Sequence, residues 1–278
     1  MSPVPMNRRA FLLQSAIAAG ALTLTALAVE APPAALASTA AAASRRMRFH
    51  GTGFQPMIAA VTLGETLRVE SVAARALRLV SAPTAPQRIE RLVEAGRTVL
   101  LRPRKPGLYL LYDDLTTRFD PQVGQVAARS DSPFFPMPAY AVVLVTDRAG
   151  GGVALTGADV NIPDTTMTFQ PWAVVCEAAT PVRFTNNDMD AHVLAPTPEP
   201  QAQRGSFDPL PLPAHGGTGV VRLAEPGLYH YYCPVHARYR PAEYTFEPLR
   251  NFGGFPFVMD GVIAVMPAGR RAAPRRRS

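Results

Sequence analysis

The chain has 278 residues, of which 47% are hydrophobic and 18% are charged. This balance excludes an intrinsically disordered chain, and the length suits one large domain or two ordinary ones. Two cysteines are too few for a disulfide scaffold or a four-cysteine zinc site. Most of the net charge of +7 arises at the two ends, which hold seven of the 28 basic residues but only one of the 21 acidic ones. The body is therefore close to neutral, and no nucleic-acid-binding face is predicted.

The first 43 residues are predicted to be an export signal. Two arginines at positions 8 and 9 precede an apolar stretch over residues 11–29, and small residues then offer cleavage sites. The segment resembles a bacterial twin-arginine signal, which implies export of a folded protein and a periplasmic location. Beyond it no apolar run reaches 18 residues, so no transmembrane span is predicted in the mature chain.

The remaining chain repeats itself. The tetrapeptide Pro-Gly-Leu-Tyr at residues 106–109 recurs at residues 226–229, an offset of 120. The same offset relates Tyr112 to Tyr232, Arg118 to Arg238, Phe135 to Phe255 and Val145 to Val265. A collinear series of matches indicates two copies of one unit. We place the copies at residues 45–147 and 153–267, followed by a basic tail at residues 268–278.

Each copy is predicted to be all-β. Residues 67–72 and 182–186 alternate apolar and polar side chains, as half-buried strands do. Residues 98–101 and 220–223 each end shortly before a Pro-Gly turn, and such punctuation suits many short strands. Residues 87–94 are the exception and are expected to form one or two helical turns. The pattern predicts two tandem β-sandwiches of about 100 residues each.

The second copy holds the residues that point to chemistry. His192, the pair Cys233 and His236, and Met259 come from the ends of three different predicted strands. Cys176, the other cysteine, lies in an apolar run and is expected to be a buried thiol, not a disulfide partner of Cys233. The four residues can therefore converge on one centre.

This pattern resembles the blue-copper, or cupredoxin, family. The likeness lies in the Asn-Asn-Asp run before His192, the Gly-Leu-Tyr strand that leads to Cys233 and His236, and the Met-x-Gly-x-Ile-x-Val strand at Met259. It implies Greek-key β-sandwiches and one type 1 copper ion, held by two imidazoles, the cysteine thiolate and a weak axial methionine. This donor set is the one that tunes trigonal copper for electron transfer.

Three departures from the family pattern stand out. Pro234 follows Cys233 directly, where the family often has a proline next to the histidine. His236 and Met259 are 23 residues apart, where the family has a short loop. Val193 occupies the position of an asparagine that commonly ties the two ligand loops together. The long loop at residues 237–258 is rich in aromatic residues, so we expect it to form a domain or subunit interface beside the copper.

The first copy has none of the four ligands. The residues aligned with His192, Cys233, His236 and Met259 are Leu77, Asp113, Thr116 and Ala139. This copy is therefore predicted to be a copper-free sandwich that covers the second copy, forms an interface or holds a partner.

The resemblance implies a periplasmic electron carrier that cycles between Cu(I) and Cu(II), and it favours this role over that of an enzyme. The alternatives are a copper oxidoreductase related to two-domain nitrite reductases or laccases, and a copper storage or delivery protein. Such enzymes need further histidines, but the chain has five and no His-x-His pair. Storage would favour clustered exposed Met and His residues, which the sequence lacks. The redox partner is open, and so is a homo-oligomeric state.

Overall fold

The computed structural model describes residues 45–198, 207–250 and 253–269. All regular secondary structure in these ranges is β-strand. The predicted signal at residues 1–43 lies outside the described residues, as does the tail from Arg270 onwards. Among the described residues, no helix has the length and apolar character that a membrane crossing requires.

The first unit contains the strands β1 to β11. Four of them form a sheet in the order β2-β1-β4-β7, five form a sheet in the order β3-β11-β8-β5-β6, and β9 and β10 form a hairpin. The strands are β1 (Arg46–Phe49), β2 (Phe54–Gln55), β3 (Ile58–Thr62), β4 (Leu67–Ser71), β5 (Leu77–Ser81), β6 (Glu90–Val93), β7 (Thr98–Leu101), β8 (Gly107–Asp113), β9 (Thr117–Asp120), β10 (Gln125–Ala128) and β11 (Tyr140–Thr146).

The second unit repeats this arrangement. Its five-stranded sheet has the order β13-β21-β18-β15-β16, which matches the first unit strand for strand, beside a sheet β12-β14-β17 and a hairpin β19-β20. The strands are β12 (Asp159–Ile162), β13 (Ala173–Glu177), β14 (Pro181–Asn186), β15 (His192–Pro196), β16 (Leu210–Leu212), β17 (Gly217–Arg222), β18 (Gly227–Tyr232), β19 (Ala237–Arg240), β20 (Thr245–Pro248) and β21 (Asp260–Met266).

Each unit is a sandwich with its own core. In the first, Phe49 and Val69 of one sheet pack with Leu79 and Leu111 of the other. In the second, Phe184 packs in one cluster with strands of the five-stranded sheet. Many neighbouring strands are distant in sequence, and each five-stranded sheet contains one parallel pair, β3 with β11 and β13 with β21. The predicted all-β fold of tandem Greek-key sandwiches is confirmed.

The helical turns expected at residues 87–94 are absent, and that expectation is wrong. Glu90–Val93 forms β6, which pairs antiparallel with β5 at the sheet edge. Ile89 and Val93 are both buried. A spacing of four places two residues on one face of a helix, but it also places them on one face of a strand. Pairing with β5 decides between the two.

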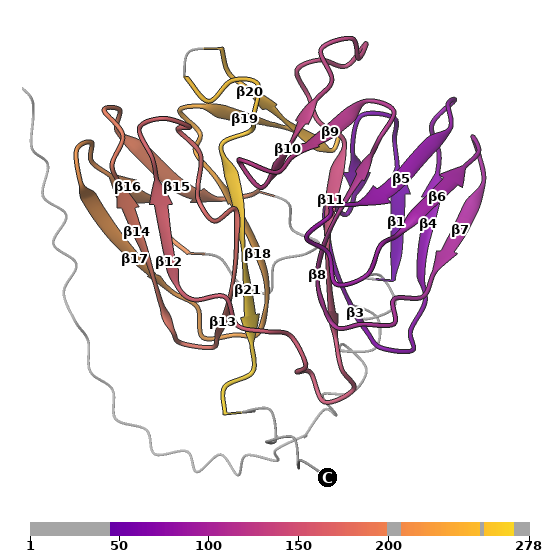
Figure 1. The fold of residues 1–278 in the computed structure, drawn as a ribbon, viewed down its shortest axis with the longest axis horizontal. Coiled ribbons are helices and arrows are strands. Elements are labelled where there is room, and N and C mark those ends of the chain that lie inside the picture. The colour runs from indigo at the N-terminus through magenta and orange to yellow at the C-terminus, as the bar shows by residue number, and fades with distance from the viewer. Residues whose placement is uncertain (1–44, 199–206, 251–252, 270–278) are drawn as a thin grey trace, which may run out of the picture.

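The two units share a third core. The five-stranded sheets face each other, with β8 and β11 of the first unit opposite β18 and β21 of the second (Figure 1). Along β18, Tyr229 and Tyr231 point into their own sandwich, whereas Leu228 and His230 point toward the interface. Both faces of these strands are therefore buried, which explains why β11 and β21 are almost continuously apolar.

The two hairpins lie at one end of the interface (Figure 1). Thr245 Oγ1 of β20 donates to the carbonyl oxygen of Pro138 in the first unit at 2.6 Å. The rings of Phe135 and Phe255 meet edge to face, with centroids 5.7 Å apart. The expectation that the loop at residues 237–258 forms a domain interface is confirmed for its described part, whereas Phe252 lies outside the described residues.

The same hairpin also covers the start of the first unit. Thr52 Oγ1 donates to the carbonyl oxygen of Glu243, and the ring of Tyr244 lies 4.2 Å from that of His50. A β-carbon at Gly53 would lie 1.9 Å from the carbonyl oxygen of Tyr244. Only glycine permits this close approach of the two backbones.

Candidate metal centre

His192 is placed by a tightly bonded loop. It is the first residue of β15 and is 1% exposed. Asn186, the last residue of β14, is fully buried, and its Nδ2 donates to the carbonyl oxygens of Asp190, Leu212 and Pro213. The side chain of Asn186 therefore links the connection between β14 and β15 to the end of β16, and these bonds restrict the position of the His192 imidazole.

Cys233 and His236 come from the turn that follows β18. The amides of His236 and Ala237 both donate to the carbonyl oxygen of Cys233, at 3.1 and 2.9 Å. The chain therefore reverses directly after the cysteine, and both side chains face the same way. Cys233 is fully buried and His236 is 3% exposed.

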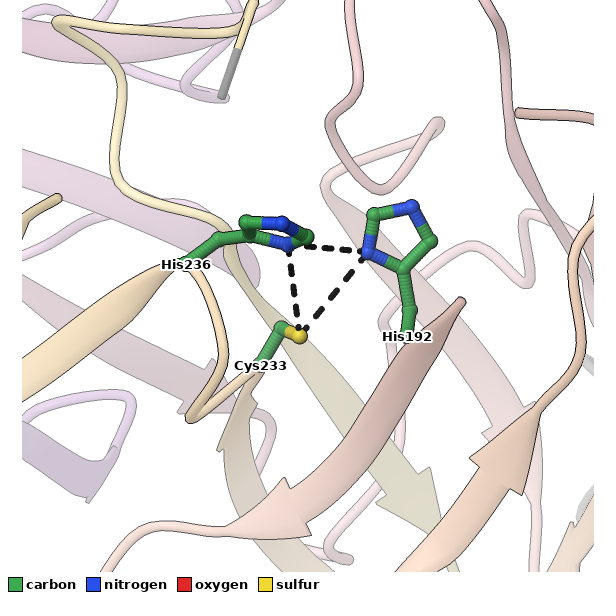
Figure 2. Close-up of side chains that lie close together, drawn as sticks. All are labelled: His192, Cys233 and His236. Atoms are coloured by element: carbon green, nitrogen blue, oxygen red, sulfur yellow. Dashed lines mark hydrogen bonds between the residues drawn. The ribbon is translucent and has the colours of Figure 1, made fainter. Parts of the chain in front are cut away.

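The three side chains converge, as Figure 2 shows. Nδ1 of His192 lies 3.0 Å from Nδ1 of His236, and Sγ of Cys233 lies 3.8 and 3.6 Å from these two atoms. A point equidistant from the three lies about 2 Å from each, close to metal–nitrogen and metal–sulfur bond lengths. Within the described ranges, this is the one group of His, Cys, Asp and Glu residues that could hold a metal ion.

Met259, the fourth predicted ligand, lies in the same buried cluster as Cys233. It is fully buried, and its carbonyl oxygen accepts the amide hydrogen of Cys233 at 2.9 Å. The backbone thus places Met259 beside the cysteine despite the 23-residue separation from His236. The role of its thioether as the axial ligand stays a prediction.

The two ligand loops are tied through the backbone. The amide of Val193 points at Sγ of Cys233 at 3.5 Å. Val193 stands where the blue-copper pattern commonly has an asparagine. A backbone donor does not depend on side-chain identity, so the link from the His192 strand to the cysteine sulfur is present with valine at this position.

Asp188 is the partner of His192 that sequence reasoning missed. Its Oδ2 lies 2.7 Å from Nε2 of His192, and both side chains are fully buried. The carboxylate favours the tautomer with the proton on Nε2, which leaves the Nδ1 lone pair free for a metal. The signal in the sequence is the spacing of four residues between Asp188, at the end of the Asn-Asn-Asp run, and His192.

Burial favours the neutral forms of the donors when no metal is bound. It raises the pKa of the Cys233 thiol, and the backbone amides of Val193, Val235 and His236 oppose that rise. It also lowers the pKa of His236, and the neighbouring His192 adds to the shift. Cys176 is buried, and both cysteines are free thiols, as expected. A bound cation reverses the balance at Cys233, because a metal favours the thiolate.

The equivalent position in the first unit is filled by an ion pair. Arg75 Nη1 lies 2.7 Å from Oδ2 of Asp113, the residue aligned with Cys233. Thr116, aligned with His236, donates its hydroxyl to the same oxygen at 2.8 Å. Asp113 is fully buried, and Arg75 also stacks over the ring of Phe49. A guanidinium–carboxylate pair thus occupies the place where the second unit has its buried donor cluster.

A second polar cluster lies beside the centre, at the interface. The carboxylate of Asp260 faces Nε2 of His230 at 2.7 Å and Nε1 of Trp172 at 3.2 Å. From the first unit, Nε2 of Gln125 lies 2.8 Å from Oδ1, and the hydroxyl of Tyr140 donates to Oδ2. His230 was expected to face away from the ligands, and its buried place at the interface agrees with that.

The strand order is that of a cupredoxin-like fold, and the donor set suits a copper ion. The buried cluster of His192, Cys233 and His236, with Met259 beside it, is consistent with a type 1 copper site. No protein-family model matches the chain. No curated protein matches it either.

Solved structures with the same kind of fold include proteins of one and of two domains. A novel purple cupredoxin from Nitrosopumilus maritimus is 20% identical and covers 39% of this chain and 99% of its own, with a TM-score of 0.27. A copper-containing nitrite reductase from Thermus scotoductus (15% identity, 79% of this chain and 66% of its own) has a TM-score of 0.26. A blue copper oxidase from Nitrosomonas europaea is 9% identical and covers 79% of this chain and 85% of its own, with a TM-score of 0.27. These scores are low, so the classification rests on the strand order and the donor set.

Proposed function

We propose that the protein is an electron carrier with one type 1 copper ion per chain, bound by His192, Cys233, His236 and Met259. The observation that carries the proposal is the triangle of two Nδ1 atoms and one sulfur, sized for a metal and buried from water. Copper in such a donor set supplies one-electron exchange between Cu(I) and Cu(II).

The protein's own residues support this role by restricting motion. His192 is held by Asp188 and by the loop bonds of Asn186, and Cys233 is held by the amides of Val193 and His236. A donor set fixed in this way changes little when an electron arrives or leaves. Burial of the donors excludes water, which would otherwise compete for the metal.

A carrier fits better than an oxidoreductase with several copper ions. His50, His215 and His230 form no further metal-binding group among the residues that the structure describes. His230 is engaged with Thr197 and Asp260. We further propose that the protein works in the periplasm, because residues 1–43 resemble a twin-arginine signal and a folded metal protein suits that route.

The proposal is tested by copper loading of the purified protein. We expect one copper per chain and an intense visible absorption from thiolate-to-copper charge transfer, and Cys233→Ser abolishes the colour. Cys176→Ser is the matched control and keeps it, because Cys176 lies in β13, outside the donor triangle. Two or more tightly bound copper ions per chain would contradict the carrier and favour an enzyme.

A further inference from the structure

One residue of the copper-free unit reaches across the interface to the backbone beside the metal centre. Gln125 in β10 is 1% exposed, and its Nε2 lies 3.1 Å from the carbonyl oxygen of Val258 and 3.2 Å from that of Asp260. These two carbonyls stand on either side of Met259. Nε2 also lies 2.8 Å from Oδ1 of Asp260, so one amide group contacts three oxygens of a three-residue segment.

The contact is made at some cost. Oε1 of Gln125 is buried and has no hydrogen-bond partner among the described residues. An unpaired buried carbonyl costs free energy that an apolar side chain of similar size would not. The amide nitrogen must offset that cost through the contacts it makes with the 258–260 segment.

Tyr140 holds the same segment from a second direction. It is the first residue of β11 and 1% exposed, and its hydroxyl donates to Oδ2 of Asp260. Trp172 and His230 of the second unit complete the ring of groups around this carboxylate. Asp260 is therefore fixed by both units at once.

The segment that these residues hold bears directly on the donors. It carries Met259, and the carbonyl oxygen of Met259 accepts the amide hydrogen of Cys233. A shift of the segment would move the predicted axial ligand and the cysteine backbone together. Gln125 and Tyr140 thus contact residues 258–260, and this segment in turn contacts Cys233.

We propose that the copper-free unit positions the metal centre through Gln125 and Tyr140, which fix residues 258–260 from across the interface. Both are positioning residues, since neither reaches the donor atoms. The predicted effects on reduction potential and on the visible spectrum rest on the proposed function. The predicted effect on amide exchange in the metal-free protein rests on the fold alone. This positioning role would explain what the first unit contributes although it lacks the four predicted ligands.

The repeat supplies a matched control. The offset of 120 relates Gln125 to Thr245 and Val258 to Pro138, and Thr245 Oγ1 donates to the carbonyl oxygen of Pro138 at 2.6 Å. The same clamp therefore acts in the opposite direction, on the unit where Ala139 takes the place of Met259. Its loss should weaken the interface by a similar amount without touching residues 258–260.

The experiment compares Gln125→Leu with Thr245→Val. In the metal-free proteins, amide exchange of Cys233 is measured by nuclear magnetic resonance. We expect exchange to be about tenfold faster in Gln125→Leu, the factor for one lost buried hydrogen bond, and unchanged in Thr245→Val. In the copper-loaded proteins, the reduction potential and the charge-transfer spectrum shift in Gln125→Leu only.

Either of two results overturns the inference: wild-type exchange and potential in Gln125→Leu, or equal changes in both variants. If Gln125→Leu does not fold, Tyr140→Phe takes its place, because it removes only the hydroxyl on Asp260. Wild-type values in Tyr140→Phe then overturn the inference. Failure of the protein to bind copper would refute the proposed function. The amide exchange of Cys233 in the metal-free protein would still test the positioning role of Gln125 and Tyr140.

Discussion

Asp188 places a negative charge one imidazole away from the predicted metal. It faces Nε2 of His192 inside the protein, where water does not screen it. Such a charge stabilises the more positive oxidised metal and lowers the reduction potential. Asp188 therefore has two effects: it orients the imidazole of His192, and it lowers the reduction potential of the metal.

Asp188→Asn separates these effects. The amide oxygen still accepts from Nε2, so copper should bind, with affinity lowered by about 10–100-fold as for other outer partners of metal ligands. The reduction potential should rise, because the negative charge is gone. Voltammetry and a competition titration measure the two quantities, and an unchanged potential would show that the Asp188 side chain exerts no electrostatic effect on the metal.

Met259 should tune the metal without holding it. Met259→Leu removes the thioether at nearly constant volume in a fully buried place. We expect full copper binding and a higher reduction potential, since a weak axial donor favours Cu(II). His236→Ala, in contrast, should open the site or abolish binding. A wild-type potential in Met259→Leu would mean that another group is axial.

The hairpin β19-β20 is the element that joins the metal centre to the interface. Its strand β19 begins directly after His236, and Phe246 of β20 is fully buried against the rings of His230, Tyr232 and Tyr239. A loop of this length would be mobile without such an anchor. The ring of Phe246 thus keeps the chain after His236 in place.

Phe246→Ala should lower the free energy of unfolding by about 3–5 kcal/mol, the usual cost of removing a buried phenylalanine ring. Denaturant unfolding measures it, and amides at residues 237–248 should then exchange faster. Val235→Ala, at a residue 43% exposed beside His236, is the control and should change stability little. A small change in the free energy of unfolding for Phe246→Ala would show that the buried ring of Phe246 does not anchor the hairpin.

At the level of elements, much could be predicted from the sequence and some could not. The repeat and the alternation of side chains predict the sandwiches, and the resemblance to the blue-copper pattern predicts that His192, Cys233 and His236 converge. Asp113 with Arg75 and Gln125 with Asp260 are different, because their partners lie far away in sequence and no pattern announces them. At residues 87–94 the apolar spacing fitted helix and strand alike, and only the neighbouring strand β5 decides.

The whole molecule depends on the core between the units. Leu110 and Val142 of the first unit and Leu228 and Val262 of the second are buried there. Cutting the chain between residues 147 and 153 would expose this apolar surface on both halves. We expect residues 153–267 alone to aggregate and to become soluble when residues 45–147 are supplied with them. Co-expression and gel filtration measure this, and a soluble, monomeric second half would contradict it.

Tyr140 and Asp260 occupy equivalent places in the two units and touch each other. Such a pair marks an approximate twofold axis, where each position meets its own counterpart. In a dimer of two second halves, Asp260 would meet Asp260, and two buried carboxylates would repel each other. In a dimer of two first halves, the two tyrosine hydroxyls would meet and the carboxylate acceptor would be missing. Separately produced halves should therefore sort into mixed pairs, because the divergence of this axial position into Tyr140 and Asp260 disfavours pairs of identical halves.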